Sequence, residues 1–186
     1  MFMLVIGGAA SGKSAFAEAC SVACGSPALY VATMEPFGEE AAARIERHRS
    51  QREGAGFATL ECPRDLAQAD LGAYAVALID DIGNLAANEL FAPSRPDARA
   101  DCVDAACDRV VAGVGRVRSA CAGVVAVTCD VSSDGVAYDE ETRAWQRALG
   151  CINARLAGDA DCVVEVVCGI PVWVKGDEDI WKGACW

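Results

Sequence analysis

The chain has 186 residues, of which 53% are hydrophobic, and a formal net charge of −11. This length allows one α/β domain with a sizeable core, and we expect a single domain over residues 1–186. The acidic balance argues against a nucleic-acid partner, because binding to a phosphate backbone needs a cationic face. No run approaches the roughly 18 apolar residues of a membrane span. The apolar start lacks the basic segment of a signal peptide, so we expect a cytoplasmic protein.

The eleven cysteines do not indicate a disulfide scaffold or a metal site. None forms a C-x-x-C pair, and the chain is long enough for an ordinary core. Several lie in apolar helix or strand patterns, where a free cysteine behaves as a small hydrophobic residue. We therefore expect the following to pack as apolar side chains: Cys20, Cys24, Cys121, Cys162 and Cys168.

The chain begins with a strand, a glycine-rich loop and a helix. The apolar run Phe2–Ile6 predicts the strand, and the loop after it matches the phosphate-binding pattern G-x-x-x-x-G-K-[ST]. In this pattern the backbone N–H groups point at phosphate oxygens, Lys13 approaches the β- and γ-phosphates, and the Ser14 hydroxyl can bind Mg²⁺. The helix predicted after Ser14 adds its dipole to the anion site. The expected nucleotide contacts are Gly7, Gly8, Ala9, Ala10, Ser11, Gly12, Lys13 and Ser14.

Short β-branched runs alternate with helical patterns along the rest of the chain. Several runs are apolar at consecutive positions, as strands buried on both faces of a parallel sheet require. A tight break at Cys168–Gly169 predicts an antiparallel edge strand at the end. Apolar spacings of three and four predict helices over 103–117 and 145–156. The expected strands are Ala28–Ala32, Phe57–Leu60, Ala75–Ile79, Val124–Thr128, Cys162–Val167 and Ile170–Val174.

These elements predict a P-loop domain with a three-layer α/β fold and a mostly parallel sheet. In such a domain, ligands bind at the carboxyl ends of the strands. At that edge Asp80 follows four apolar residues, the place where P-loop enzymes keep the carboxylate that holds Mg²⁺ or its water. Asp81 would face the other way if the strand continued. The alternative for this pair is a helix N-cap before Ile82, which suits Asp81 better than Asp80.

The single histidine, His48, lies in a basic segment. If residues 44–52 form a helix, Arg44, His48 and Arg52 share one face. Neighbouring cations disfavour the imidazolium form, which leaves a neutral and nucleophilic ring at pH 7. Such a histidine can take a nucleotidyl group covalently before passing it on, while the arginines bind a triphosphate. A solvated basic helix face accounts for the pattern equally well.

Further segments fit one family pattern in the same order as the P-loop. They are Tyr30–Thr33, Ala43–Ile45 followed by His48 and Arg49, Glu61–Cys62, Asp80 with Asn88–Phe91, and Trp145–Ala157. Together they resemble the bifunctional adenosylcobinamide kinase/adenosylcobinamide-phosphate guanylyltransferase family of cobalamin biosynthesis, over nearly the whole chain. Many kinases share the P-loop alone, but a P-loop followed by Y-[IV]-A-T and R-I-x-x-H-[KR] at this spacing is quite specific.

The resemblance implies a RecA-like P-loop fold and an enzyme with two activities. Family members phosphorylate the aminopropanol hydroxyl of adenosylcobinamide with ATP or GTP. They then transfer GMP from GTP, through a GMP-histidine intermediate at the position of His48, to adenosylcobinamide phosphate, giving adenosyl-GDP-cobinamide. A corrinoid substrate and a homo-oligomer, often a trimer with sites between subunits, are also implied. Besides Lys13 and His48 as catalytic residues and Ser14 and Asp80 for Mg²⁺, the implied nucleotide contacts are Ala32, Thr33, Arg49, Ser50, Gln51, Arg52 and Glu61.

One loop departs from the family pattern V-T-N-E-V-G-x-G-[IV]-V-P, because residues 127–137 read V-T-C-D-V-S-S-D-G-V-A. Cys129 lacks the hydrogen-bonding groups of an amide, and Asp130 shortens a carboxylate by one methylene. A glycine and a proline that shape the loop are gone. Since the loop follows the carboxyl end of a strand, we expect substrate fit, subunit contacts or one of the two activities to be altered.

Three other interpretations stay open. The loop after the first strand could be a glycine-rich turn, which the strand before it and the helix after it disfavour. The protein could be a P-loop kinase of another small hydroxylated substrate, in which His48 only supports phosphate binding. It could also be a nucleotide-binding regulatory module without turnover, although the intact Lys13, Ser14 and Asp80 favour an enzyme.

Overall fold

The computed structural model describes residues 1–35, 56–92, 102–131, 136, 138–179 and 181. In this part of the chain, one sheet has the strand order β3-β2-β4-β5-β1-β6-β7. Its strands are β1 (Phe2–Ile6), β2 (Ala28–Ala32), β3 (Phe57–Glu61), β4 (Val76–Asp80), β5 (Gly123–Val127), β6 (Cys162–Val167) and β7 (Ile170–Lys175). The helices are α1 (Lys13–Cys24), α3 (Ile82–Leu90), α4 (Val103–Ala120) and α5 (Glu140–Asp159), with a short 3₁₀-helix, η1 (Leu66–Gln68).

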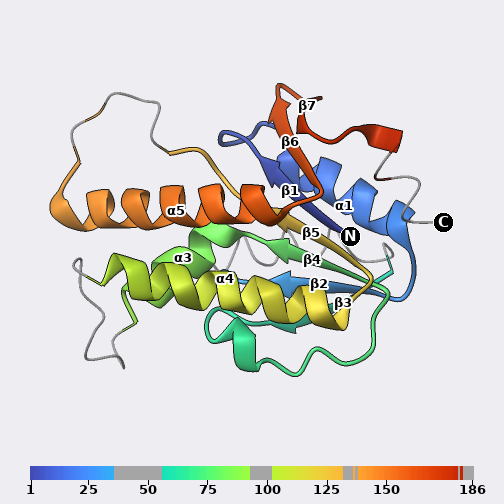
Figure 1. Ribbon diagram of the computed structural model, residues 1–186, viewed down its shortest axis with the longest axis horizontal. Helices are drawn as coiled ribbons and strands as arrows, with labels where there is room; N and C mark the ends of the chain where they lie inside the picture. Colours follow the sequence, from blue (N-terminus) through green and yellow to red (C-terminus); the bar gives the residue numbers. More distant parts are fainter. Residues whose placement is uncertain (36–55, 93–101, 132–135, 137, 180, 182–186) are drawn as a thin grey trace.

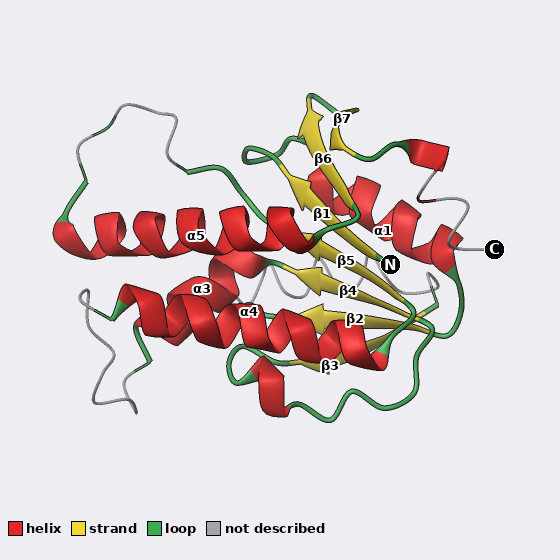
Figure 2. Ribbon diagram, in the orientation of Figure 1, coloured by secondary structure: helices red, strands yellow, loops and turns green. Residues whose placement is uncertain are grey.

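The sheet is parallel from β3 to β6, and only the β6–β7 pair is antiparallel. Parallel neighbours need crossover connections, and the helices of these connections cover both faces of the sheet (Figure 1). Helices α3, α4 and α5 lie on one face, and α1 lies on the other (Figure 2). The expected three-layer α/β fold with an antiparallel edge strand is therefore confirmed.

Side chains of each central strand alternate between two cores. In β1, Phe2 and Leu4 pack with residues of α4 and α5, whereas Met3 and Val5 pack on the α1 side. All four are at most 1% exposed. Burial on both faces removes apolar surface from water at every position, which explains why these strands are apolar at consecutive residues.

Two of the cysteines differ from the expectation of free apolar packing. Cys24, at the end of α1, is disulfide-bonded. Cys168 is exposed, because it occupies the tight turn between β6 and β7 with a φ of 51°. The local apolar pattern could not reveal either feature, since a disulfide depends on which residues meet in space and a turn places its side chains outside the sheet.

Candidate active site

The glycine-rich loop joins β1 to α1 and is shaped by close backbone contacts. A Cβ at Gly7 would lie 2.6 Å from the Ser11 Oγ and 2.7 Å from the carbonyl oxygen of Val166 in β6. Gly12 has a φ of 92°, which favours glycine, and lies directly before the first residue of α1. The two glycines therefore allow the loop to fold tightly at the carboxyl end of β1.

The turn between β6 and β7 supports this loop from a distant part of the chain. Cys168 and Gly169 both have positive φ angles, 51° and 80°, as in a two-residue hairpin turn. The Gly169 N–H donates to the Ser11 carbonyl over 2.8 Å. A Cβ at Gly12 would lie 3.3 Å from the Gly169 Cα. The last hairpin thus packs directly on the phosphate-binding loop.

Lys13 and the start of α1 supply positive potential to the loop. The Lys13 Nζ donates to the Gly8 carbonyl over 3.2 Å, which holds the ammonium group against the loop. The first turn of α1 carries no acidic residue, so the positive end of the helix dipole is not neutralised there. This arrangement suits the polyphosphate of a nucleotide.

Substitution of Gly7 by alanine should destabilise the protein, because its Cβ would overlap a backbone carbonyl of the sheet. We expect the free energy of unfolding to fall by about 1–3 kcal/mol, the usual cost of overpacking. Gly8→Ala is the matched control, since a Cβ there has nothing within 4 Å. Thermal unfolding of the two variants checks this. Equal melting temperatures would show that the loop does not need the close approach at Gly7.

Asp80 ends β4 on the same side of the sheet as α1. In β4, Ala77 and Ile79 belong to the core under α4 and α5, and Leu78 to the other core, so alternation places Asp80 on the α1 face. The Tyr30 hydroxyl, from the neighbouring strand β2, donates to the Asp80 Oδ2 over 2.5 Å. This hydrogen bond fixes the carboxylate at the carboxyl end of the sheet.

Asp81 is the N-cap of α3, which agrees with the alternative interpretation of the Asp80–Asp81 pair. Its Oδ1 accepts from the Asn84 N–H over 2.7 Å. The Thr33 hydroxyl, which is buried, donates to the Asp81 carbonyl over 2.7 Å, and the Thr33 N–H donates to the Asp80 carbonyl over 3.2 Å. Thr33 therefore fixes the backbone that carries both carboxylates.

The other predicted nucleotide contacts next to Thr33 lie at the ends of their strands. Ala32 ends β2 and is half-buried, and Glu61 is its partner in β3 and is exposed. The predicted residues Arg49, Ser50, Gln51 and Arg52, together with His48, lie outside the described residues.

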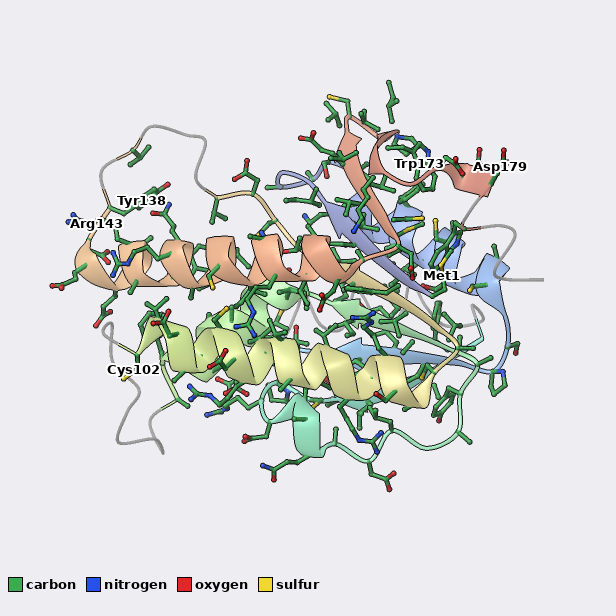
Figure 3. The ribbon with its side chains drawn as sticks, viewed as in Figure 1. Met1, Cys102, Tyr138, Arg143, Trp173 and Asp179 are labelled. Carbon is green, nitrogen blue, oxygen red and sulfur yellow. The ribbon has the colours of Figure 1, made fainter. Side chains whose placement is uncertain are left out.

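A cavity of about 360 Å³ opens beside the phosphate-binding loop. It is formed by the loop, by the start of α3, by the segment after β5 and by the first turns of α5. Its lining residues are Ala9, Lys13, Asp81, Cys129, Asp130, Val131, Tyr138, Thr142, Trp145 and Gln146. Tyr138 lies just before α5, where Figure 3 labels it. Four of these residues were not predicted as site residues, because only the packing of α5 brings them to the loop: Tyr138, Thr142, Trp145 and Gln146.

Two side-chain amides of helix α5, from Asn153 and Gln146, hold the unusual segment after β5. The Thr128 hydroxyl donates to the Asn153 Oδ1 over 2.7 Å, and the Asn153 Nδ2 donates to the Cys129 carbonyl over 3.2 Å. Two turns earlier in α5, the Gln146 Nε2 donates to the Val131 carbonyl over 2.8 Å. Side-chain amides from α5 therefore fix the described start of this segment at two points.

The Cys129 thiol lies between groups of opposite charge. Burial, with a smaller contribution from the Asp81 carboxylate, raises the pKa of the Cys129 thiol to about 11, and the Lys13 ammonium group opposes the rise. The thiol is therefore protonated at neutral pH and is a weak nucleophile. The family departure at this position places a small neutral side chain in the cavity beside Lys13.

The described residues hold neither a cluster of candidate metal ligands nor a helix that could span a membrane. In those ranges, no group of three or more His, Cys, Asp or Glu side chains is placed to hold a metal ion. Likewise, none of the described helices is long and apolar enough to span a bilayer.

Comparisons with known proteins cover nearly the whole chain. Residues 3–174 match the family described as "Cobinamide kinase / cobinamide phosphate guanyltransferase". The chain is 36% identical over 183 residues to the bifunctional adenosylcobalamin biosynthesis protein CobU of Salmonella typhimurium, covering 94% of this chain and 100% of the relative. It is 34% identical over 186 residues to CobU of Escherichia coli, with the same coverage. Identity to the bifunctional protein CobP of Pseudomonas aeruginosa is 27% over 179 residues, covering 94% of this chain and 97% of the relative.

Proposed function

The chain belongs to the cobinamide kinase / cobinamide phosphate guanyltransferase family, and we propose that it performs both reactions of that family as one catalytic domain. In the first, ATP or GTP phosphorylates the aminopropanol hydroxyl of adenosylcobinamide. In the second, GMP from GTP is transferred to adenosylcobinamide phosphate, which gives adenosyl-GDP-cobinamide and pyrophosphate. The proposal is supported above all by the phosphate-binding loop between β1 and α1, because its Lys13 borders a cavity. This loop lies in a chain that matches the family over residues 3–174.

We assign the triphosphate to the loop Gly7–Ser14 and to the N-terminus of α1. The proposed metal is Mg²⁺, held by the Ser14 hydroxyl and the Asp80 carboxylate. Both groups offer oxygen ligands, which Mg²⁺ prefers, and alternation places Asp80 on the face of the sheet that α1 covers. Bound Mg²⁺ would neutralise charge on the β- and γ-phosphates. A site completed by phosphates and water needs few protein ligands.

The guanylyl step is assigned to His48, through the family resemblance. Its imidazole nitrogen would attack the α-phosphorus of GTP, and pyrophosphate would leave, which stores GMP on the protein. Arg49, Ser50, Gln51 and Arg52 are proposed to contact phosphates, and Ala32, Thr33 and Glu61 to contact the nucleotide. Of these, Thr33 donates its hydroxyl hydrogen to the Asp81 carbonyl, which leaves the hydroxyl oxygen able to accept a hydrogen bond.

We further propose that the protein works as a homo-oligomer, a trimer by family resemblance, in the cytoplasm where its nucleotide substrates are made. The exposed face of the last hairpin supports self-association. Ile170, Val172 and Val174 of β7 are 65%, 47% and 64% exposed and lie on one face of the edge strand, since they alternate along it. Such a row of apolar side chains on an edge strand is a natural contact surface.

Incubation of the protein with adenosylcobinamide, ATP and Mg²⁺ tests the first reaction. We expect one phosphate to be transferred to the corrinoid, detected as a mass gain in the corrinoid fraction, and we expect product only when all three components are present. Addition of GTP should then convert the phosphate to the GDP derivative. A protein that hydrolyses nucleotide but leaves the corrinoid unchanged would contradict the proposal.

A further inference from the structure

The cavity beside Lys13 begins where the terminal phosphate of a bound nucleotide would end. The lysine of this loop motif reaches the β- and γ-phosphates. The cavity is lined by Ala9 and Lys13 of the loop and by Tyr138 and Thr142 at the start of α5. The cavity therefore leads away from the reactive phosphate towards the first turn of α5. A second substrate must approach the γ-phosphate from such a space.

The volume of the cavity limits what it can hold. About 360 Å³ accommodates roughly twelve water-sized groups at about 30 Å³ each. A short flexible arm fits this space together with a phosphoryl group, whereas a macrocycle does not. The rest of a large substrate must therefore remain outside the cavity.

The lining combines a fixed carboxylate with aromatic and apolar walls. Asp81 is held in place because its Oδ1 caps α3 through the Asn84 N–H. A carboxylate has sites for about four hydrogen bonds, so the cap leaves it able to accept others. Trp145 is also fixed, since its Nε1 donates to the Gly83 carbonyl over 3.0 Å. With Val131 and Tyr138 it offers apolar surface to the carbon atoms of an arm.

We propose that this cavity is the acceptor pocket for phosphoryl transfer: it binds the alcohol-bearing arm of the second substrate, and Asp81 accepts a hydrogen bond from the hydroxyl that is phosphorylated. The assignment rests on the kinase reaction proposed above. The hydroxyl oxygen forms a bond to the γ-phosphorus, the bond from that phosphorus to the β–γ bridging oxygen breaks, and the nucleoside diphosphate leaves. The hydroxyl proton passes to solvent.

The structure favours Asp81 over the other nearby carboxylates. Asp80 is on the α1 face, where its Oδ2 accepts from the Tyr30 hydroxyl, and it does not line the cavity. Asp130 lines the cavity but is exposed. Asp81 is half-buried and anchored at a helix start, so it can orient a hydroxyl with little further loss of freedom.

Asp81→Asn tests the hydrogen bond. The amide oxygen preserves the cap on α3 but loses the charge that strengthens a bond from a hydroxyl. We expect kcat/KM for cobinamide phosphorylation to fall roughly ten- to a hundredfold, while the Kd of a non-hydrolysable GTP analogue is unchanged. The control is Asp139→Asn at the N-cap of α5, the same change at a cap that does not line the cavity. It should keep the wild-type kcat/KM.

Thr142→Trp tests occupancy of the pocket independently of Asp81. An indole at this rim position fills part of the cavity, so KM for cobinamide should rise roughly tenfold or more, again without a change in nucleotide affinity. Arg147→Trp is the matched control, since Arg147 is exposed on the same helix and does not line the cavity.

The outcomes separate this inference from the function on which it rests. If Asp81→Asn and Thr142→Trp both phosphorylate cobinamide at the wild-type rate, the acceptor pocket is overturned and the proposed function stays intact. Loss of nucleotide affinity in Thr142→Trp would show that the cavity holds the nucleotide, and this result would also overturn the acceptor pocket. Loss of activity in Asp130→Asn with normal activity in Asp81→Asn would overturn the role of Asp81. Wild-type protein that leaves cobinamide unphosphorylated would overturn the proposed function itself.

Discussion

Protein incubated with GTP labelled at its α-phosphate is expected to become labelled at His48. The bond would be a phosphoramidate between the imidazole and the GMP phosphorus, which is labile in acid and stable in alkali, unlike a serine ester. His48 is the single histidine of the chain, so in untagged protein any phosphohistidine must lie there. His48→Asn should abolish the label completely, because an amide cannot act as the nucleophile.

Two controls accompany the labelling experiment. Thermal unfolding of His48→Asn should match that of the wild-type protein, which excludes misfolding as the cause of a missing label. GTP labelled at the γ-phosphate should leave no label, since pyrophosphate is released. A label that survives acid, or one that persists in His48→Asn, would rule out the GMP-histidine intermediate.

Lys13→Ala should weaken triphosphate binding roughly ten- to a hundredfold. The ammonium group of Lys13 supplies a charge-assisted contact to the phosphates, and such contacts contribute about 1.5–3 kcal/mol. In the structure this group lies against the loop, where its Nζ donates to the Gly8 carbonyl. Isothermal titration calorimetry with a non-hydrolysable GTP analogue and Mg²⁺ measures the effect.

Lys175→Ala is the control for this variant. Lys175 is exposed on β7, and its Nζ donates to the carbonyls of Ala157 and Gly158, away from the loop. It should bind the analogue like the wild-type protein. Equal affinities for Lys13→Ala and the wild-type protein would remove the loop from nucleotide binding.

Strands buried on both faces could be predicted well, because a short run of consecutive apolar residues between turns is typical of them. The predicted bounds of Phe2–Ile6, Ala28–Ala32 and Cys162–Val167 agree with β1, β2 and β6. The helix cap at Asp81 was also predictable, since a carboxylate before an apolar helix is a local signal. The short η1 was missed, because a single 3₁₀ turn leaves no periodic pattern.

The cavity could not be predicted because it depends on contacts between distant segments. Trp145 appears in the sequence only as an apolar position of a helix, but its Nε1 holds the Gly83 carbonyl at the start of α3. The nucleotide contact of Thr33 stays a prediction, and the hydrogen bond from its hydroxyl to the Asp81 carbonyl could not be foreseen from the sequence. The Gly169 N–H supports the phosphate-binding loop by donating to the Ser11 carbonyl. No local sequence pattern encodes a contact between residues so far apart in the chain.

Transfer of GMP from the protein to the corrinoid is the most direct measurement of the proposed function. Protein labelled with GMP is freed of nucleotide and mixed with adenosylcobinamide phosphate. We expect the label to leave the protein and appear in adenosyl-GDP-cobinamide at the same rate, and to stay on the protein when the corrinoid is omitted. Label that remains bound in the presence of the corrinoid, or that appears only as free GMP, would contradict the proposed transfer of GMP through the protein.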